Sequence, residues 1–415
     1  MIRIGIRCDA GPVTGVGHLM RCLALADELA ARGAAVHLLA DVGGLPWAVD
    51  RIGAHDLEWG PAPAGPAELV AAVRRLGLDA VVLDSYTLDP GTGVALRAAG
   101  VPVLALIDGE PRGAVADVYV DQNLDAELAT PALPPGAVRL AGLRYCLLGS
   151  AVRRLRPERP RPAGERAVPR VLCFFGGTDA FGAAPTVARL LLGTGAPLDA
   201  TVVGATERIR GQLRELAPGA GQRLTVIEPT DELAPLMAAA DLVVAASGTS
   251  AWELLCLGAP AALVWVVDNQ RLGYDRLVRR ELVAGLGRLA DLAADPAGLP
   301  APAGEEAEAS RPAAGDAAEA SGPAAGEEAE ASRPAAGDAA GAAGRATEQL
   351  RLLLTDPDRR TRLGARAWAA VDGRGVRRVA DELLARAAAP DRTGRPDRGP
   401  GGDRATEDRA DRLVR

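Results

Sequence analysis

Residues 11–20, GPVTGVGHLM, place one of only three histidines directly after a glycine-rich stretch. Gly15 and Gly17 lie two residues apart, and His18 follows them where an apolar helical pattern begins. A glycine-rich turn lets backbone N–H groups approach an anion, and a helix N-terminus adds the positive end of a dipole. That dipole disfavours the imidazolium form, which helps to keep the ring neutral and able to accept a proton. His18 is therefore a candidate general base, and a capping or packing role is the simpler alternative.

Two familiar kinds of cofactor site are not supported. The dinucleotide fingerprint GxGxxG would require glycine where Met20 stands, so the loop is poor evidence for NAD binding. All 47 basic residues are arginine, which excludes a P-loop lysine and a Schiff-base lysine for pyridoxal phosphate. No acidic cluster suggests a metal site, so we expect neither a metal nor a cofactor.

Glycine and hydroxyl residues recur in the second half of the chain, where they favour a phosphate site. Gly177 and Thr178 follow one apolar run, and Ser247, Gly248 and Thr249 follow another at the start of a helical pattern. Backbone N–H groups and hydroxyls in such places can bind a diphosphate, although small hydroxyl residues are also ordinary helix caps.

Polar side chains that suit a sugar stand near the same loops. Glu253 lies one helical turn after Thr249, where its carboxylate could accept from both hydroxyls of a ribose or simply complement the helix dipole. Asn269 and Gln270 end the next strand, and their amides could bind sugar hydroxyls or cap the following helix. Together these residues predict a nucleotide and a sugar along one edge of one sheet.

The elements that must position these residues alternate between strands and helices. This alternation predicts an α/β protein with two doubly wound, mostly parallel sheets, and their ligand would lie between them at the carboxyl ends of the strands. The expected strands are 2–7, 35–40, 80–84, 101–108 and 116–123 in the first half, and 170–177, 199–204, 224–228, 241–247 and 261–268 in the second.

Composition suggests where the domains begin and end. We expect a first domain at 1–150, a linker rich in Arg and Pro at 151–169, and a second domain at 170–293 plus 345–389. The stretch GEEAEASRPAAGDAA occurs twice within 294–344, which lacks β-branched and aromatic residues and is predicted to be a disordered insertion. The polar tail 390–415 is predicted to be disordered as well.

Charge and cysteine usage exclude several classes of partner. The net charge is −7 and no basic block is present, so a nucleic-acid partner is not expected. The five cysteines are scattered without a CxxC pair, which argues against a zinc site or a disulfide scaffold. The chain begins as a strand rather than a signal peptide, and no apolar run reaches about 18 residues. We expect a cytoplasmic protein without a membrane span, and its oligomeric state stays open.

Several motifs together resemble the PseG/SpsG family, the UDP-sugar hydrolases of pseudaminic acid biosynthesis and their relatives in spore-coat polysaccharide biosynthesis. These proteins share the two-domain GT-B fold with the MurG glycosyltransferase. The resemblance covers roughly residues 1–285, and its most specific element is G-x-G-H-x-x-R, which ends at Arg21. The other matching stretches are VVLDSY, ADVYVDQN, FFGGTDAFG, ASGTSAWELLCLGAP and VVDNQ, with VDGRGVRRV near the C-terminus.

The resemblance implies a role for each candidate residue. His18 would be the catalytic base, and Asp9 and Tyr86 would lie near the sugar. The sugar or the diphosphate would contact Asn269 and Gln270. UDP would lie against the second domain, at Gly177, Thr178, Ser247, Gly248, Thr249 and Glu253.

The chain also departs from the family pattern at two places. Gly149 stands where an arginine is usual, and a strand that often ends in Asp-Asp ends here in Asp108-Gly109. These departures lie where substrate would be contacted, so they leave the identity of the sugar open. The leading hypothesis is a UDP-sugar hydrolase, in which His18 activates water and UDP is the leaving group. A GT-B glycosyltransferase with the same site is the main alternative, and a non-catalytic nucleotide-sugar-binding protein is the third.

Overall fold

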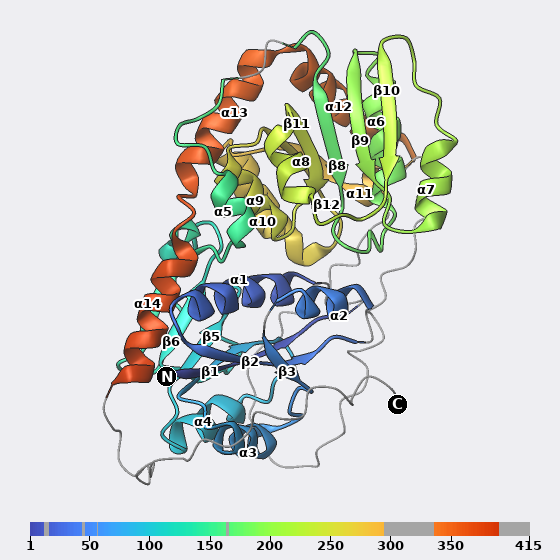
Figure 1. The fold of residues 1–415 in the computed structure, drawn as a ribbon. Coiled ribbons are helices and arrows are strands. Elements are labelled where there is room, and N and C mark those ends of the chain that lie inside the picture. Colours follow the sequence, from blue (N-terminus) through green and yellow to red (C-terminus); the bar gives the residue numbers. More distant parts are fainter. Residues whose placement is uncertain (12–15, 44–45, 56, 163–165, 294–335, 390–415) are drawn as a thin grey trace, which may run out of the picture.

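Two sheets of parallel strands, one above the other in Figure 1, form the body of the protein. The computed structural model describes residues 1–11, 16–43, 46–55, 57–162, 166–293 and 336–389. The first sheet has seven strands and the second has six, and helices cover both faces of each. The prediction of two doubly wound α/β domains is therefore confirmed.

The first domain is built on the sheet β3-β2-β1-β4-β5-β6-β7. Its helices α1 and α2 cover one face and α3 and α4 cover the other (Figure 1). The strands are β1 (Arg3–Asp9), β2 (Ala35–Asp41), β3 (Glu58–Gly60), β4 (Ala80–Asp84), β5 (Val103–Leu106), β6 (Val118–Asp121) and β7 (Val138–Ala141). The helices are α1 (Gly17–Ala31), α2 (Pro46–Gly53), α3 (Pro66–Leu76) and α4 (Gly91–Ala98). Central strands such as β4 are buried along their whole length, which explains their continuous apolar sequence.

The second domain repeats this architecture with the sheet β10-β9-β8-β11-β12-β13. Its strands are β8 (Arg170–Phe174), β9 (Leu198–Val203), β10 (Gln222–Ile227), β11 (Leu242–Ala246), β12 (Ala261–Trp265) and β13 (Ala284–Arg288). Its helices are α6 (Ala183–Gly193), α7 (Glu207–Arg214), α8 (Leu233–Ala239), α9 (Ser250–Leu257), α10 (Arg271–Arg279), α11 (Leu289–Leu292), α12 (Ala336–Thr355) and α13 (Pro357–Ala370).

Part of the stretch expected to be a linker is a helix. Helix α5 (Ser150–Leu155) carries Val152, which is buried in one core of the second domain together with residues of α8 and α9. The linker predicted over 151–169 therefore contains a helix near its start. The helix could not be predicted from an apolar period, because Val152 is its one buried residue and is enough to anchor so short a helix.

The helix before the C-terminus also begins earlier than expected. Helix α12 starts at Ala336, inside the segment 294–344 that composition assigned to a disordered insertion. Its alanine-rich first turns suit a helix, since alanine has the highest helix propensity. The remainder of that predicted insertion, 294–335, and the predicted tail, 390–415, lie outside the described residues.

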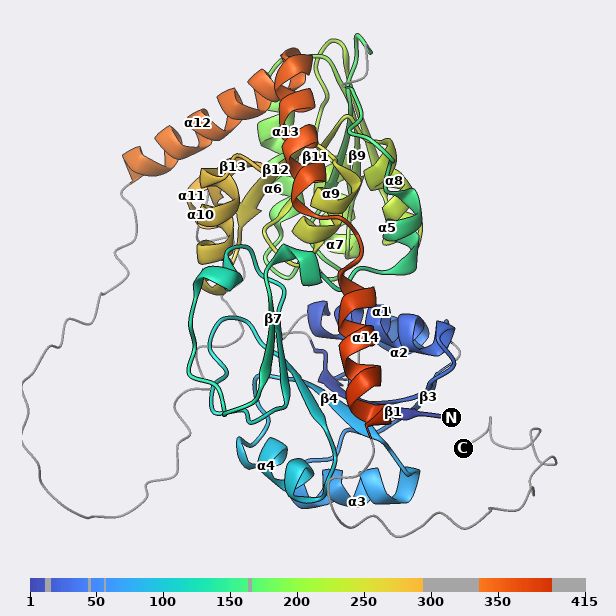
Figure 2. The same cartoon turned by 90° about the vertical axis from the view of Figure 1, so that its left-hand side faces the viewer.

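The last helix returns to the first domain. Helix α14 (Gly375–Ala388) packs its apolar side against α1, and Val376, Val379 and Leu383 are buried in the first domain's core (Figure 2). The sequence had placed 345–389 with the second domain. A side chain at Gly375 would lie 2.4 Å from the backbone nitrogen of Cys146, so the crossing requires glycine there.

Candidate active site

His18 lies at the start of α1, where the two domains meet. Val16 precedes the helix, so His18 is its second residue, and only 7% of its surface is exposed. A Cβ atom at Gly17 would lie 3.2 Å from Cγ2 of Thr249 in the second domain. A Cβ atom at Gly177 would lie 3.8 Å from Cγ2 of Val16. The glycines thus allow the predicted loops of the two domains to touch, and Gly15 lies outside the described residues.

Asp84 stands behind His18 and is the functional residue that sequence reasoning missed. It ends β4, the strand beside β1, and is fully buried. Its Oδ1 atom lies 2.5 Å from Nδ1 of His18. A carboxylate at the end of an apolar strand, within the quoted stretch VVLDSY, was the signal that could have identified it.

Arg21, one turn further along α1, holds Asp84 in its ionised form. Its Nε atom donates to Oδ2 of Asp84 at 2.7 Å and its second terminal nitrogen donates to Oδ1 at 2.6 Å. Burial opposes ionisation of Asp84, but the charge and hydrogen bonds of Arg21, with a contribution from His18, outweigh it and lower the pKa of this carboxyl. Arg21, the last residue of the G-x-G-H-x-x-R motif, therefore binds the buried carboxylate of Asp84 within the first domain.

The carboxylate–histidine contact defines which ring nitrogen is reactive. Arg21 also lies 3.1 Å from Nδ1 of His18, but the closer carboxylate of Asp84 assigns the proton to Nδ1. The lone pair is then on Nε2, for which no described residue supplies a hydrogen bond. A neutral imidazole oriented by a buried carboxylate can accept a proton from water or from a hydroxyl.

Tyr86 joins the same cluster from the loop after β4. Its ring meets that of His18 edge-on, with centroids 4.6 Å apart, and its hydroxyl donates to Oδ2 of Asp108 at 2.5 Å. Burial and the negative charge of Asp108 raise the pKa of Tyr86, so the phenol stays protonated. Asp108 also binds Arg21 and accepts from the amide of Asn123 at 2.9 Å. Asp108, the residue before the departure at Gly109, is thus part of this cluster.

Asp9 lies at the end of β1 but is not bonded to the His18 cluster. One oxygen of its carboxylate accepts from Arg7, and the other oxygen is buried without a partner among the described residues. The structure therefore places Asp9 near the start of the glycine-rich loop and shows no direct contact with His18.

The second domain brings its predicted loops to the start of α9. Thr249 precedes this helix without a side-chain capping bond, which does not support the simple capping role considered for it. Ser247 is buried, and its backbone nitrogen donates to Val264 at 2.8 Å. Gly177 and Thr178 follow β8, and the neighbouring Asp179 caps α6 by accepting from backbone nitrogens.

Gln270 and Asn269 follow β12, the strand next to β11. Gln270 accepts from the backbone nitrogen of Val266 at 3.0 Å, and a Cβ atom at Gly248 would lie 4.0 Å from its side-chain nitrogen. Asn269 is exposed. The structure therefore brings Gln270 beside the glycine loop and leaves the amide of Asn269 in contact with solvent.

Glu253 lies in the first turn of α9 and has an unusual environment. Burial raises the pKa of its carboxyl to about 7, against the opposing charge of Arg51. No hydrogen bond to this carboxyl is found among the described residues. An acidic residue in the first turn of a helix that only complements the helix dipole would normally be solvated. The desolvation of the Glu253 carboxyl is therefore unusual for such a position.

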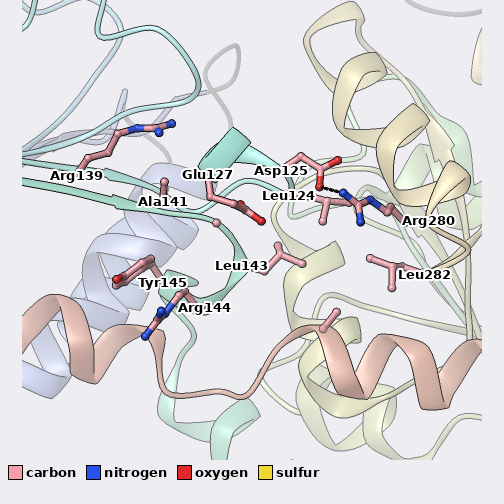
Figure 3. A pocket seen from close by; sticks show the side chains of 12 residues that line it. Leu124, Asp125, Glu127, Arg139, Ala141, Leu143, Arg144, Tyr145, Arg280 and Leu282 are labelled. Atoms are coloured by element: carbon pink, nitrogen blue, oxygen red, sulfur yellow. Dashed lines mark hydrogen bonds and ion pairs between the residues drawn. The ribbon is translucent and has the colours of Figure 1, made fainter. Parts of the chain in front are cut away.

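A further hollow in the described part of the chain lies away from these residues (Figure 3). It is a groove of about 750 Å³ between the two domains. Leu124, Arg139 and Tyr145 line it from the first domain, and Arg280 and Leu282 line it from the second. None of the predicted site residues lines this groove.

Among the described residues, no group of three or more histidine, cysteine, aspartate or glutamate side chains is arranged to hold a metal ion. No helix in that part of the chain combines the length and the apolar character needed to cross a bilayer.

Comparison with known proteins gives structural similarity only. No protein-family model and no curated protein sequence matches the chain. MurG from Acinetobacter baumannii is 15% identical and aligns with a TM-score of 0.56 over 93% of this chain and all of its own. UGT89C1 from Arabidopsis thaliana, solved with UDP, is 12% identical, with a TM-score of 0.54 over 92% of this chain and all of its own. UGT2 from Phytolacca americana, solved with UDP-2-fluoroglucose and pterostilbene, is 10% identical, with a TM-score of 0.55 over 94% of this chain and all of its own. These alignments cover both sheets, and they show that the chain has the MurG-like GT-B fold, with two Rossmann-like domains.

Proposed function

We propose that this protein is a UDP-sugar hydrolase that uses His18 as a general base. The observation that carries the proposal is the contact between His18 and the buried carboxylate of Asp84, at the place where the loops of the two domains meet. UDP-sugar binding is supported by the fold that the chain shares with enzymes solved with UDP or a UDP-sugar. The resemblance to the PseG/SpsG family supports an amino-deoxy sugar as the substrate and a role in polysaccharide or pseudaminic-acid-like biosynthesis.

The reaction would consist of one displacement at the anomeric carbon. Nε2 of His18 accepts a proton from water while the water oxygen forms a bond to that carbon. The bond from the carbon to the diphosphate oxygen breaks, and UDP leaves with its electron pair. Asp84 stabilises the imidazolium that forms, because its carboxylate accepts the hydrogen bond from Nδ1.

The second domain would bind the leaving nucleotide. Backbone N–H groups at Gly177 and Thr178 and the N-terminus of α9 would stabilise the diphosphate, and Gly248, whose own N–H donates to Ala246, would let the diphosphate approach the backbone closely. Ser247 and Thr249 would add hydroxyl groups, and Glu253 would accept from the ribose. Asn269 and Gln270 would contact the sugar or the diphosphate, and Asp9 and Tyr86 would line the sugar on the opposite side.

A glycosyltransferase is the second candidate, and one observation favours it. The fold is shared with UGT2 from Phytolacca americana, which was solved with a UDP-sugar together with pterostilbene. In that reaction an acceptor hydroxyl would replace water, and His18 would have the same role.

Release of UDP without an acceptor distinguishes the two candidates. Purified protein would be incubated with a panel of UDP-sugars, including amino-deoxy sugars, and free UDP would be measured. We expect release in buffer alone from at least one of these substrates. Release that requires an added sugar or lipid acceptor would assign the protein to the glycosyltransferases, and tight binding of a UDP-sugar with no turnover under either condition would favour a binding protein.

A further inference from the structure

Arg51 extends from the first domain to the second beside the proposed nucleotide site. It lies in the last turn of α2, on the side of the first domain that faces the second (Figure 1). One terminal nitrogen of Arg51 donates to Oδ1 of Asp231 at 2.5 Å. Asp231 lies in the loop between β10 and α8, so this ion pair joins the two domains.

The same guanidinium acts on a second carboxylate of the second domain. The charge of Arg51 opposes the effect of desolvation on the pKa of Glu253. Arg51 is therefore paired with Asp231, which is 79% exposed at its side chain, and lies within electrostatic range of Glu253, which is half-buried and has no hydrogen bond among the described residues. Because Glu253 is the residue expected at the ribose, Arg51 lies beside the nucleoside half of a bound UDP-sugar rather than beside the sugar attached to the diphosphate.

Arg51 also retains a donor that no described residue uses. Its Nε atom is buried and has no hydrogen-bond partner in the described part of the chain, although its side chain is 29% exposed overall. A buried N–H without a partner is costly, and most such groups in proteins are satisfied. A ligand atom that accepts from Nε would remove that cost. A planar guanidinium can also stack on the face of a base.

We propose that Arg51 is a nucleoside-binding residue, contributed by the first domain, that contacts the ribose or the base of the nucleotide bound at Glu253. This inference rests on the proposed function. It assigns to the first domain a share in nucleotide recognition, in addition to catalysis. Nucleotide binding would then draw the two domains together, because Arg51 and Glu253 would contact the same ligand from opposite sides.

Calorimetric titration with UDP and with uridine tests the assignment. Arg51→Gln should weaken both ligands by roughly tenfold to a hundredfold, because a hydrogen bond from a charged donor is lost. Asp231→Asn removes the ion pair but keeps Arg51, and should weaken either ligand by less than about fivefold, since exposed ion pairs contribute little. Arg351→Gln is the matched control, because Arg351 pairs with Glu348 on α12, which belongs to the second domain's other core. Its affinities should equal those of the wild type, and the melting temperatures of all variants should be compared.

Four results would overturn the inference. Unchanged affinities in Arg51→Gln would show that this residue makes no ligand contact. An equal loss in Asp231→Asn would show that the ion pair between the domains, and not a ligand contact, is responsible. A loss for UDP without a loss for uridine would move the contact to the diphosphate. A wild-type protein that binds neither ligand would overturn the proposed function and this inference together, so the two failures are distinguishable.

Discussion

Replacing His18 by asparagine tests the proposed base most directly. The variant removes the group that accepts the proton and keeps a short polar side chain at the start of α1. General-base catalysis typically contributes about 10²–10⁴ in rate, which corresponds to about 3–5.5 kcal/mol of the activation barrier. Turnover at saturating substrate should therefore fall at least about a hundredfold.

The fold and the nucleotide affinity should be retained in this variant. Asp84 loses one hydrogen bond but keeps both bonds from Arg21 and the thiol contact of Cys22 at 3.4 Å. Apart from Arg51, the residues proposed to bind UDP belong to the second domain, and no hydrogen bond joins any of them to His18. Single-turnover measurements of UDP release would be combined with circular dichroism and UDP titration. Normal turnover in a folded variant would refute the reasoning and leave His18 as a structural residue.

Three other variants test the surroundings of the site. Asp84→Asn should lower turnover by about a hundredfold or more, because the His18 ring is no longer oriented. It should also lower the melting temperature, because leaving the buried charge of Arg21 without this partner costs about 3–5 kcal/mol. An active variant of wild-type stability would exclude the role of Asp84 in orienting His18. Glu253→Gln should weaken UDP binding and yet stabilise the unliganded protein above neutral pH. The pKa of Glu253 rises from 4.5 in the unfolded chain to about 7 in the folded protein, so the folded state binds more protons between these values. The stability of the wild type therefore falls as the pH rises through this range, and the variant lacks this loss. Thermal melts from pH 5 to pH 8 would measure this, and a constant difference between variant and wild type would contradict it. Deleting residues 295–335, which spares α12, should leave turnover and melting temperature nearly unchanged, because the deleted sequence lacks β-branched and aromatic residues; a large fall in either would show that the segment supports the fold.

The sequence was sufficient to predict the two sheets because their strands are marked locally. Apolar runs such as 80–84 and 241–247 are short and are separated by helical patterns, and buried parallel strands require such runs. The alternation of these elements then allows few topologies. The start of α1 was found for the same reason, since a glycine-rich loop before an apolar period is a local signal.

The partners of the candidate base were not predictable in the same way. Asp84 and Asp108 lie far from His18 in the sequence, and only the order of strands β1, β4 and β5 brings their carboxylates to Arg21. A single aspartate at a strand end carries no sign of which helix it will face. The roles proposed for the second-domain residues stay predictions, since glycine and small hydroxyl residues in such loops are also ordinary helix caps.

The course of α14 also affects how the protein is made. The first domain's sheet is complete at β7, yet its core includes Val376, Val379 and Leu383 from the last helix. During synthesis, the face of α1 that receives this helix stays uncovered until nearly the whole chain has left the ribosome. The second domain has no such delay for α6 to α11, so it can bury most of its apolar surface first. We therefore expect the domain that is translated first to be the last to finish folding.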